Sequence, residues 1–280
     1  MNYYMNYYLI IILIIILIAI IFLLTKKDKF ENTSSDILLT TPDETINTIN
    51  VTENKMEGKV IPLNIFMTWE TKQLPINMQK SVEMVISKNS DFNFYIYDDT
   101  DCRNFLKKYF IKDVVDAFDN LIPGAYKADL WRYCVLYYYG GIYQDIKFNP
   151  VGTFKYNNLL DKEYFVRDIA MSGSGIYNAF MVCKPGNEIL YKCIKEIIKN
   201  VKNKFYGSSS LEPTGPLLMK KFFTKTEINN LELYNKSIII NGIYKNNIKI
   251  LDFYKNYRLE QKKSSKPHYS NLWKNKNIYM

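Results

Sequence analysis

The segment 127–147 constrains the fold of this chain more than any other part of the sequence. It begins with a helical pattern that places Asp129 and Arg132 on one helix face, and it continues as an apolar and aromatic run. The run ends at the glycine pair 140–141, where glycine permits the positive φ angles of a chain reversal. A short β-like segment then leads to Asp145, and the carboxyl ends of strands are where open α/β sheets bind ligands. We therefore expect Asp129, Arg132 and Asp145 to reach one pocket.

Strand-like and helix-like patterns alternate from residue 60 onward. The expected strands cover 61–69, 92–97, 142–145, 163–167, 177–183, 237–240 and 248–253, and the expected helices cover 75–88, 101–109, 114–120, 123–139, 188–202 and 217–223. We expect the last two strands to pair with each other. The acidic run 98–101 has the composition of a turn and a helix N-cap. This alternation predicts an α/β fold with a mostly parallel central sheet flanked by helices.

The N-terminal region differs in composition from the rest of the chain. Residues 7–24 form an uninterrupted apolar run of 18 residues, which meets the length criterion for a transmembrane helix. A cleaved signal peptide is disfavoured, because no basic segment precedes the run and no small-residue cleavage site follows it. Residues 25–58 are polar and aperiodic, as in a flexible stalk. The sequence thus predicts a transmembrane anchor over 1–24, a stalk over 25–58 and one folded domain over 59–280.

The orientation of the anchor in the membrane stays open. Three lysines directly follow the apolar run, and the positive-inside rule would then hold the folded domain in the cytosol. N-glycosylation sequons at Asn32, Asn50 and Asn235 would instead suit a lumenal domain. In a chain this rich in asparagine, three such triplets are close to the number expected by chance.

The charge and the cysteines narrow the function classes. The net charge is +9, but the lysines are dispersed rather than gathered into a basic run, which argues against a nucleic-acid partner and favours an anionic substrate. Cys102, Cys134, Cys183 and Cys193 lack metal-ligand spacing, so we expect buried thiols rather than disulfides. A single histidine and the lack of G-x-S-x-G and Walker A motifs argue against a serine hydrolase and a P-loop enzyme.

The segment 127–147 resembles the sugar-binding signature of nucleotide-sugar glycosyltransferases of the GT-A type. It is most similar to family 32, which includes yeast outer-chain mannosyltransferases, and more distantly similar to the large clostridial glucosylating toxins. The positions that fit the family pattern are Lys127, Ala128, Asp129, Arg132, Tyr133, Leu136, Gly140, Gly141, Tyr143 and Asp145. Lys147 instead occupies the position of the second Asp in the D-x-D motif of the family.

Two other stretches carry a weaker resemblance to the same family. The stretch 61–69 resembles its opening strand, although Phe66 and Met67 stand where the family often has His-Gln. His268, followed by Ser270 and Trp273, resembles a C-terminal cluster that lies near the diphosphate in related enzymes. Together the three stretches span residues 59–280 and imply a GT-A nucleotide-sugar-binding fold.

The resemblance implies roles for particular residues. Asp129 and Arg132 would hold sugar hydroxyls, and Asp145 would contact the ribose, the sugar or a metal ion. Trp69 would stack on the nucleotide base, and Asn178 would lie near the sugar. Without the resemblance, the first two residues would be a local ion pair and Trp69 could equally be a core residue.

A divalent cation is the point at which this sequence departs from its family. Family members hold Mn²⁺ or Mg²⁺, which prefer oxygen ligands, between two carboxylates. Lys147 removes one ligand and adds a positive charge. Either Asp145 and His268 still bind a cation, which we expect only together with the nucleotide, or the ammonium of Lys147 takes over part of the work of the metal. Loss of activity is the third alternative.

The sequence therefore predicts a membrane-anchored glycosyltransferase. The enzyme would transfer a hexose from a nucleoside-diphosphate sugar to a glycan, lipid or protein acceptor, with retention of configuration as in the family. The expected location is a single-pass position in a Golgi- or ER-like membrane, or in a viral or host membrane. The alternative is a catalytically inactive, membrane-tethered protein that binds sugars or nucleotides.

Overall fold

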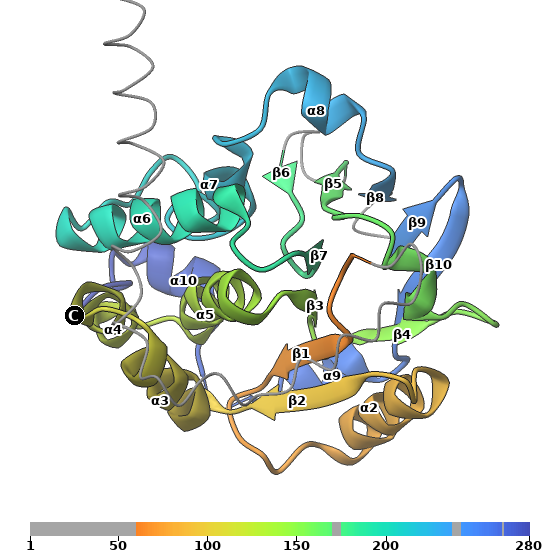
Figure 1. Ribbon diagram of the computed structural model, residues 1–280. Coiled ribbons are helices and arrows are strands. Elements are labelled where there is room, and N and C mark those ends of the chain that lie inside the picture. The colour runs from red at the N-terminus through yellow and green to blue at the C-terminus, as the bar shows by residue number, and fades with distance from the viewer. Residues whose placement is uncertain (1–59, 170–174, 237–241, 265) are drawn as a thin grey trace, which may run out of the picture.

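A computed structural model describes residues 60–169, 175–236, 242–264 and 266–280 (Figure 1). The expected anchor over 1–24, the stalk over 25–58 and the expected strand 237–240 lie outside the described residues. Within the described ranges, no helix is both long and apolar enough to cross a membrane.

A four-stranded sheet lies at the centre of the first half of the domain. Its strand order is β2-β1-β3-β7, from β1 (Asn64–Thr68), β2 (Asn93–Tyr97), β3 (Gly141–Gln144) and β7 (Phe180–Cys183). Strand β1 pairs in parallel with both β2 and β3, whereas β7 runs antiparallel to β3. The expected parallel sheet is therefore confirmed for its first three strands, whose carboxyl ends meet at one edge.

Helices cover both faces of this sheet. Successive side chains of a strand point to opposite faces, so apolar side chains on each face can pack against helices. In β1, Phe66 packs into one buried apolar cluster, whereas Ile65 and Met67 pack into another. The first cluster includes side chains of α3 (Asp99–Tyr109), α4 (Lys112–Asn120), α5 (Gly124–Tyr139) and α6 (Glu188–Lys202), and the second includes side chains of α2 (Ile76–Lys88). Figure 1 shows α5 and α6 on one side of the strands and α2 on the other.

The sequence placed these five helices to within two residues at each end. The largest differences are at α4, which begins at Lys112 rather than Val114, and at α3, which begins at Asp99 rather than Asp101. Asp98 accepts a hydrogen bond from the backbone N–H of Asp101, and the Asp101 side chain accepts one from the backbone N–H of Asp98. This capping box satisfies orphan donors of the first turn and moves the start of the helix forward.

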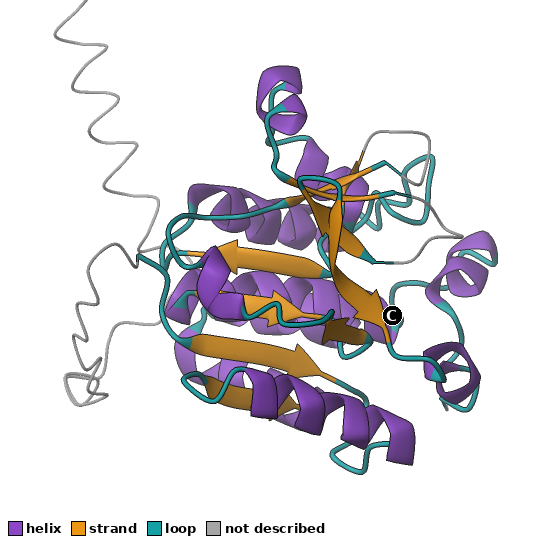
Figure 2. Cartoon of the chain, turned by 90° about the vertical axis from the view of Figure 1, so that its right-hand side faces the viewer, coloured by secondary structure: helices purple, strands orange, loops and turns teal. Residues whose placement is uncertain are grey.

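A six-stranded, mainly antiparallel sheet adjoins the first one (Figure 2). The sequence predicted its strand 248–253 in full and its strand Val166–Asp168 in part, but not the sheet as a whole. Its order is β4-β10-β9-β8-β5-β6, from β4 (Phe148–Pro150), β5 (Val166–Asp168), β6 (Gly175–Ile176), β8 (Leu233–Asn235), β9 (Ile243–Lys245) and β10 (Ile248–Phe253). Most of these strands are too short to show a period of two. Strand β10 pairs with β9 through a two-residue turn at Asn246 and Asn247, both of which have positive φ.

Short helices complete the fold, and several of them border the site described below. They are the 3₁₀ turn Tyr156–Leu159, α7 (Pro216–Lys220), α8 (Lys225–Asn229), α9 (Tyr257–Gln261) and α10 (Tyr269–Lys274). The expected helix 217–223 is α7, which starts one residue earlier at Pro216 and ends at Lys220.

The chain reversal and the thiols agree with the sequence. Gly140 and Gly141 have φ angles of 61° and 111°, so a side chain at either position would be strained. A Cβ at Gly141 would also lie 2.6 Å from the backbone oxygen of Asn64 in the neighbouring strand. All four cysteines are free and buried, as the sequence predicted for these thiols.

Candidate active site

A cavity of about 840 Å³ lies at the carboxyl ends of the strands. Trp69 follows β1 and Asp145 follows β3, and both line this cavity. The second sheet contributes Asp168 and Asn235, the last residues of the parallel pair β5 and β8. The fold thus brings strand ends from both sheets to one place, as expected for ligand binding by α/β proteins.

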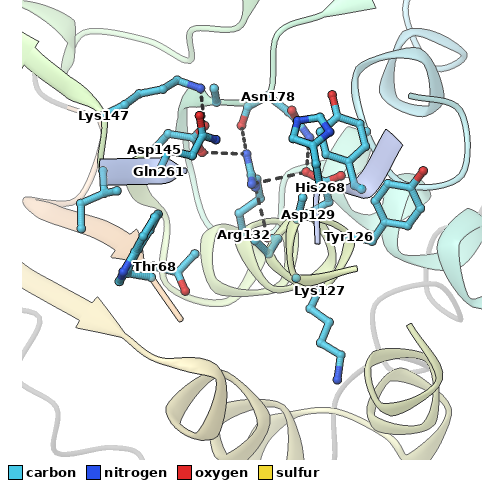
Figure 3. Close-up of a pocket in the computed structure, with 18 of the residues that line it drawn as sticks. Thr68, Tyr126, Lys127, Asp129, Arg132, Asp145, Lys147, Asn178, Gln261 and His268 are labelled. Carbon is cyan, nitrogen blue, oxygen red and sulfur yellow. Dashed lines mark hydrogen bonds and ion pairs between the residues drawn. The ribbon is translucent and has the colours of Figure 1, made fainter. Parts of the chain in front are cut away.

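Asp145 is the centre of a polar network on the cavity wall (Figure 3). Its Oδ1 accepts hydrogen bonds from Arg132 at 3.1 Å and from the Tyr143 hydroxyl at 2.8 Å, and its Oδ2 accepts one from Lys147 at 2.6 Å. Burial raises the pKa of Asp145, but the charges of Lys147 and Arg132 outweigh it and hold the pKa below the ordinary value. Because its pKa is lowered, this carboxylate is ionised at neutral pH. Its side chain is 24% exposed, so it is also accessible from the cavity.

Arg132 connects this network to Asp129. Its guanidinium donates to the backbone oxygen of Asn178 at 2.9 Å, lies 3.4 Å from Asp129 Oδ1 and stacks over the Tyr143 ring at 4.4 Å. Burial opposes its charge, but Tyr143, Asp145 and Asp129 together hold its pKa above the ordinary value. A buried guanidinium held on several sides has a fixed orientation, which is what recognition of a polar ligand requires.

Asp129 occupies a different environment from Asp145. Thr214 donates to its Oδ2 at 2.7 Å and the Asn178 side-chain amide donates to its Oδ1 at 2.9 Å. Burial raises the pKa of Asp129, and the nearby Arg132, Thr214 and Asn178 offset this only in part. The Asp129 carboxylate thus interacts with the side chains of Asn178 and Arg132.

Lys147 lies in an aromatic enclosure beside Asp145. Its Nζ is 5.2 Å from the ring centres of Phe148, Tyr177 and Phe253. Burial lowers the pKa of Lys147, but the Asp145 charge outweighs this and the pKa is raised. The ammonium is therefore charged at neutral pH, and it faces the cavity that Lys147 lines.

The structure brings together most of the residues that the sequence singled out. Asp129, Arg132 and Asp145 form one network, as expected from the helix and the chain reversal. The wall of the same cavity also contains Trp69, Lys147, Asn178 and His268.

The C-terminal cluster is only partly at the site. His268 lines the cavity and caps α10, where its Nδ1 lies 2.7 Å from the Ser270 hydroxyl. Burial and the nearby Arg258 lower the pKa of His268, so its imidazole is neutral at pH 7. Trp273 donates its indole N–H to the backbone oxygen of Tyr206 at 2.7 Å and is not among the cavity-lining residues, and neither is Ser270.

Several residues at the site were given no role by the sequence, although Tyr143 fits the family pattern. Tyr143 precedes Asp145 by two positions, and this strand spacing could have suggested a shared location. Thr214 lies in the stretch Pro213-Thr214-Gly215-Pro216, which indicated only a helix start. Asn235 donates a hydrogen bond of 2.9 Å to Asp168; the sequence marked Asn235 only as an N-glycosylation sequon, and no motif marks Asp168.

The donor set at this site does not fit a resident divalent cation. Mn²⁺ and Mg²⁺ prefer several oxygen ligands, carboxylates above all. Both oxygens of Asp145 already accept hydrogen bonds, one of them from an ammonium. Among residues 60–169, 175–236, 242–264 and 266–280, no three His, Cys, Asp or Glu side chains gather as a metal site would require.

A cavity lined by a network of paired charges is typical of an α/β protein that binds a polar small molecule. Residues 75–166 match the family described as glycosyltransferase sugar-binding region containing DXD motif. This segment contains Asp129, Arg132, Asp145 and Lys147. Residues 75–166 of the chain are therefore similar to this sugar-binding region, with Lys147 at the position of the second Asp of the DXD motif.

The individual relatives include fungal glycosyltransferases. The initiation-specific α-1,6-mannosyltransferase of Candida albicans is 31% identical over 96 residues, which cover 32% of this chain and 25% of that protein. Mannosyl phosphorylinositol ceramide synthase CSH1 of Saccharomyces cerevisiae is 29% identical over 191 residues, which cover 68% of this chain and 49% of that protein. The matches thus span from a quarter to about half of the length of these relatives, and they agree with a protein of the family-32 kind.

A solved structure is also similar in part. The PaToxG glycosyltransferase superposes with a TM-score of 0.47 at 22% sequence identity, over 57% of this chain and 68% of that chain.

Proposed function

We propose that this protein is a glycosyltransferase that moves a hexose from a nucleoside-diphosphate sugar to an acceptor hydroxyl. The observation that carries the proposal is the network of Asp129, Arg132 and Asp145 on the cavity wall, inside the matched sugar-binding region. Within this network, Asp145 and Arg132 offer ionised groups that can bind sugar and ribose hydroxyls. A GT-A type of nucleotide-sugar-binding fold accompanies this proposal.

The shape of the site supports a donor of this size. A volume of about 840 Å³ lies within the usual range of small-molecule pockets, which is about 300–1,000 Å³. Trp69 at the end of β1 offers an aromatic surface for a nucleotide base, and Asn178 reaches the region between Asp129 and Arg132. We assign the base to the Trp69 side and the hexose to the Asp129–Arg132 side.

The proposed reaction is a substitution at the anomeric carbon. The bond between this carbon and the diphosphate oxygen breaks, and its electron pair stays on the diphosphate. The oxygen of the acceptor hydroxyl forms the new bond to the same carbon. The proton of that hydroxyl passes to the departing diphosphate. The configuration is retained when the diphosphate leaves from, and the acceptor oxygen attacks, the same face of the sugar. Arg132 and Asp145 would hold the sugar in the geometry that this substitution requires.

The names of the relatives suggest a hexose and an acceptor class. Mannosyltransferases are the relatives described above, and one of them is named as a synthase of a mannosylated inositol ceramide. We therefore propose mannose as the first sugar to test, with a glycan or a lipid as the acceptor and a protein as the third option. The apolar run 7–24 and the polar stretch 25–58 support a membrane-anchored enzyme that would reach such acceptors at a membrane surface.

A donor screen tests this proposal. Full-length protein in detergent is incubated with UDP- and GDP-linked hexoses, and release of the nucleoside diphosphate is measured with and without acceptor. We expect hydrolysis of one donor well above the background, and loss of that hydrolysis in Asp145→Asn. Release of the nucleoside diphosphate at background level with every donor would reject the proposal that this protein is an enzyme.

An inactive sugar- or nucleotide-binding protein is the second candidate, and Lys147 at the position of the second Asp of the motif is the observation that favours it. This protein would bind a donor in calorimetry without releasing its diphosphate.

A further inference from the structure

The position of Lys147 is set by a turn, not by a continuing strand. Strand β3 ends at Gln144, and the backbone N–H of Phe148 then donates to the backbone oxygen of Asp145 at 3.1 Å. This turn folds the Lys147 side chain back toward Asp145, so that Nζ lies 2.6 Å from Oδ2. The ammonium therefore occupies the side of the carboxylate where a cation ligated by Asp145 would bind.

The enclosure of Lys147 makes its charge effective. The lysine is 9% exposed and is surrounded by the three rings of Phe148, Tyr177 and Phe253. Aromatic faces attract a cation without neutralising it, and they exclude the water that would screen it. An ammonium has three donors, and Asp145 is the one carboxylate partner of Lys147 among the described residues. Further donors can therefore serve an anionic ligand.

The Asp145–Lys147 pair has the same net charge as two carboxylates that hold a divalent cation. Two carboxylates with one divalent cation have a summed charge of zero, since −2 and +2 cancel. Asp145 with Lys147 also has a summed charge of zero, since −1 and +1 cancel. Replacement of an aspartate by a lysine changes the local charge by two units, which equals the charge of the cation. A divalent ion added to the present pair would instead have to displace or approach a buried ammonium.

We propose that the ammonium of Lys147 replaces the divalent cation and stabilises the departing diphosphate, so that glycosyl transfer proceeds without a metal ion. This inference rests on the proposed function. When the bond between the anomeric carbon and the diphosphate oxygen breaks, negative charge grows on that oxygen. Lys147 donates hydrogen bonds to the diphosphate oxygens at that moment, while Arg132 keeps Asp145 paired and in place.

The first test measures donor hydrolysis by the full-length protein in detergent, in EDTA and then in Mn²⁺. Wild-type turnover should be the same in both within about twofold. Lys147→Met should lower it about 10²- to 10³-fold, as expected for loss of one preorganised donor. The matched control is Lys263→Met, a removal of an exposed lysine outside the cavity lining, and it should change turnover less than about twofold. Loss of wild-type turnover in EDTA with recovery in Mn²⁺ would overturn the proposal.

The second test makes transfer depend on a metal ion by restoring the second carboxylate. Lys147→Asp restores the two-carboxylate motif, so this variant should be inactive in EDTA, regain part of its turnover in Mn²⁺ and bind Mn²⁺ in calorimetry when UDP or GDP is present. A Lys147→Asp variant that stays indifferent to Mn²⁺ in both assays would contradict the proposal. Thermal melts accompany each variant, and Lys147→Met should remain folded because Asp145 keeps Arg132 and Tyr143.

A binding measurement separates failure of this inference from failure of the proposed function. UDP and GDP are titrated into each protein in EDTA. A nucleotide that binds wild type and Lys263→Met equally, but Lys147→Met at least about tenfold more weakly, supports the role of Lys147 even if no donor turns over. In that case only the enzyme assignment fails. Nucleotide binding by wild type that requires Mn²⁺, or equal affinities in all three proteins, would reject the role of Lys147.

Discussion

Two carboxylates, Asp129 and Asp145, meet the same arginine in this cavity but have opposite environments. Asp129 accepts hydrogen bonds from the neutral groups of Thr214 and Asn178, and burial raises its pKa. Asp145 is paired with two cations, which hold its pKa below the ordinary value. Hydrogen bonds from neutral donors fix the position of a side chain, whereas ionised groups exert an electrostatic force on a bound ligand. We therefore assign positioning to Asp129 and contact with the ligand to Asp145.

The largest effect is expected for Asp145→Asn. The amide would present its NH₂ or its single oxygen to Lys147 and Arg132. Lys147 would lose its carboxylate partner, and Arg132 would keep only Asp129. We expect donor hydrolysis to fall about 10³-fold and the free energy of unfolding to fall by about 3 kcal/mol. Turnover near wild type would break the distinction between the two carboxylates.

Asp129→Asn should be milder. An amide oxygen can accept from Thr214 or from Asn178 but not from both in the present geometry, so one hydrogen bond is lost at about 1–3 kcal/mol. Displacement of Arg132 should reduce turnover about 10- to 100-fold. Donor hydrolysis and urea unfolding are measured beside Asp145→Asn. Equal losses of turnover in the two variants would show that Asp129 also contacts the ligand.

The pH dependence of stability should separate the two carboxylates by sign. The pKa of Asp145 is lowered in the folded state, so its stabilisation is present above the ordinary value of 3.8 and is lost as the pH falls below it. The pKa of Asp129 is raised, so its ionisation destabilises the fold above 3.8, and protonation relieves this as the pH falls through the raised pKa.

Urea unfolding of wild type and of both Asn variants from pH 7 to pH 3 measures these contributions, each about 1.4 kcal/mol per unit of pKa shift. The stability gap between wild type and Asp145→Asn should narrow below pH 3.8. Wild type should gain stability relative to Asp129→Asn as the pH falls toward 3.8. Parallel curves for all three proteins would contradict the environments described above.

The smallest effect is expected for Thr214→Val, which removes the hydroxyl donor of Asp129 and keeps the shape of the side chain. Stability should fall by about 1–2 kcal/mol, because the buried carboxylate loses one partner. Turnover should fall less than about fivefold, since Asn178 still holds Asp129. Thr214→Ser keeps the hydroxyl and serves as the control. A loss of turnover as large as that of Asp129→Asn would show that Thr214 contacts the ligand directly.

The local elements at the site followed from the sequence because their signals are local. The helical period of 124–139, the glycine pair with positive φ and the acidic cap at Asp98 each depend on residues within one or two turns. The resemblance of segment 127–147 to a sugar-binding signature is also a local pattern, and the family match over 75–166 agrees with it. The second sheet left little such signal. Its longest strand, β10, was predicted at 248–253, but its other strands have only two or three residues.

The sequence by itself determined which residues could bind a sugar and the order in which the helix, the reversal and the carboxylate follow each other. Only the tertiary structure decided their partners. Thr214 lies 85 residues from Asp129, and Asn178 lies 49 residues from it, and no periodicity relates such distant positions. The placement of Lys147 against Asp145 also required the turn after β3 and rings from three separate segments. A side chain acquires its charge state and its role from the groups packed around it, and only the folded chain brings those groups together.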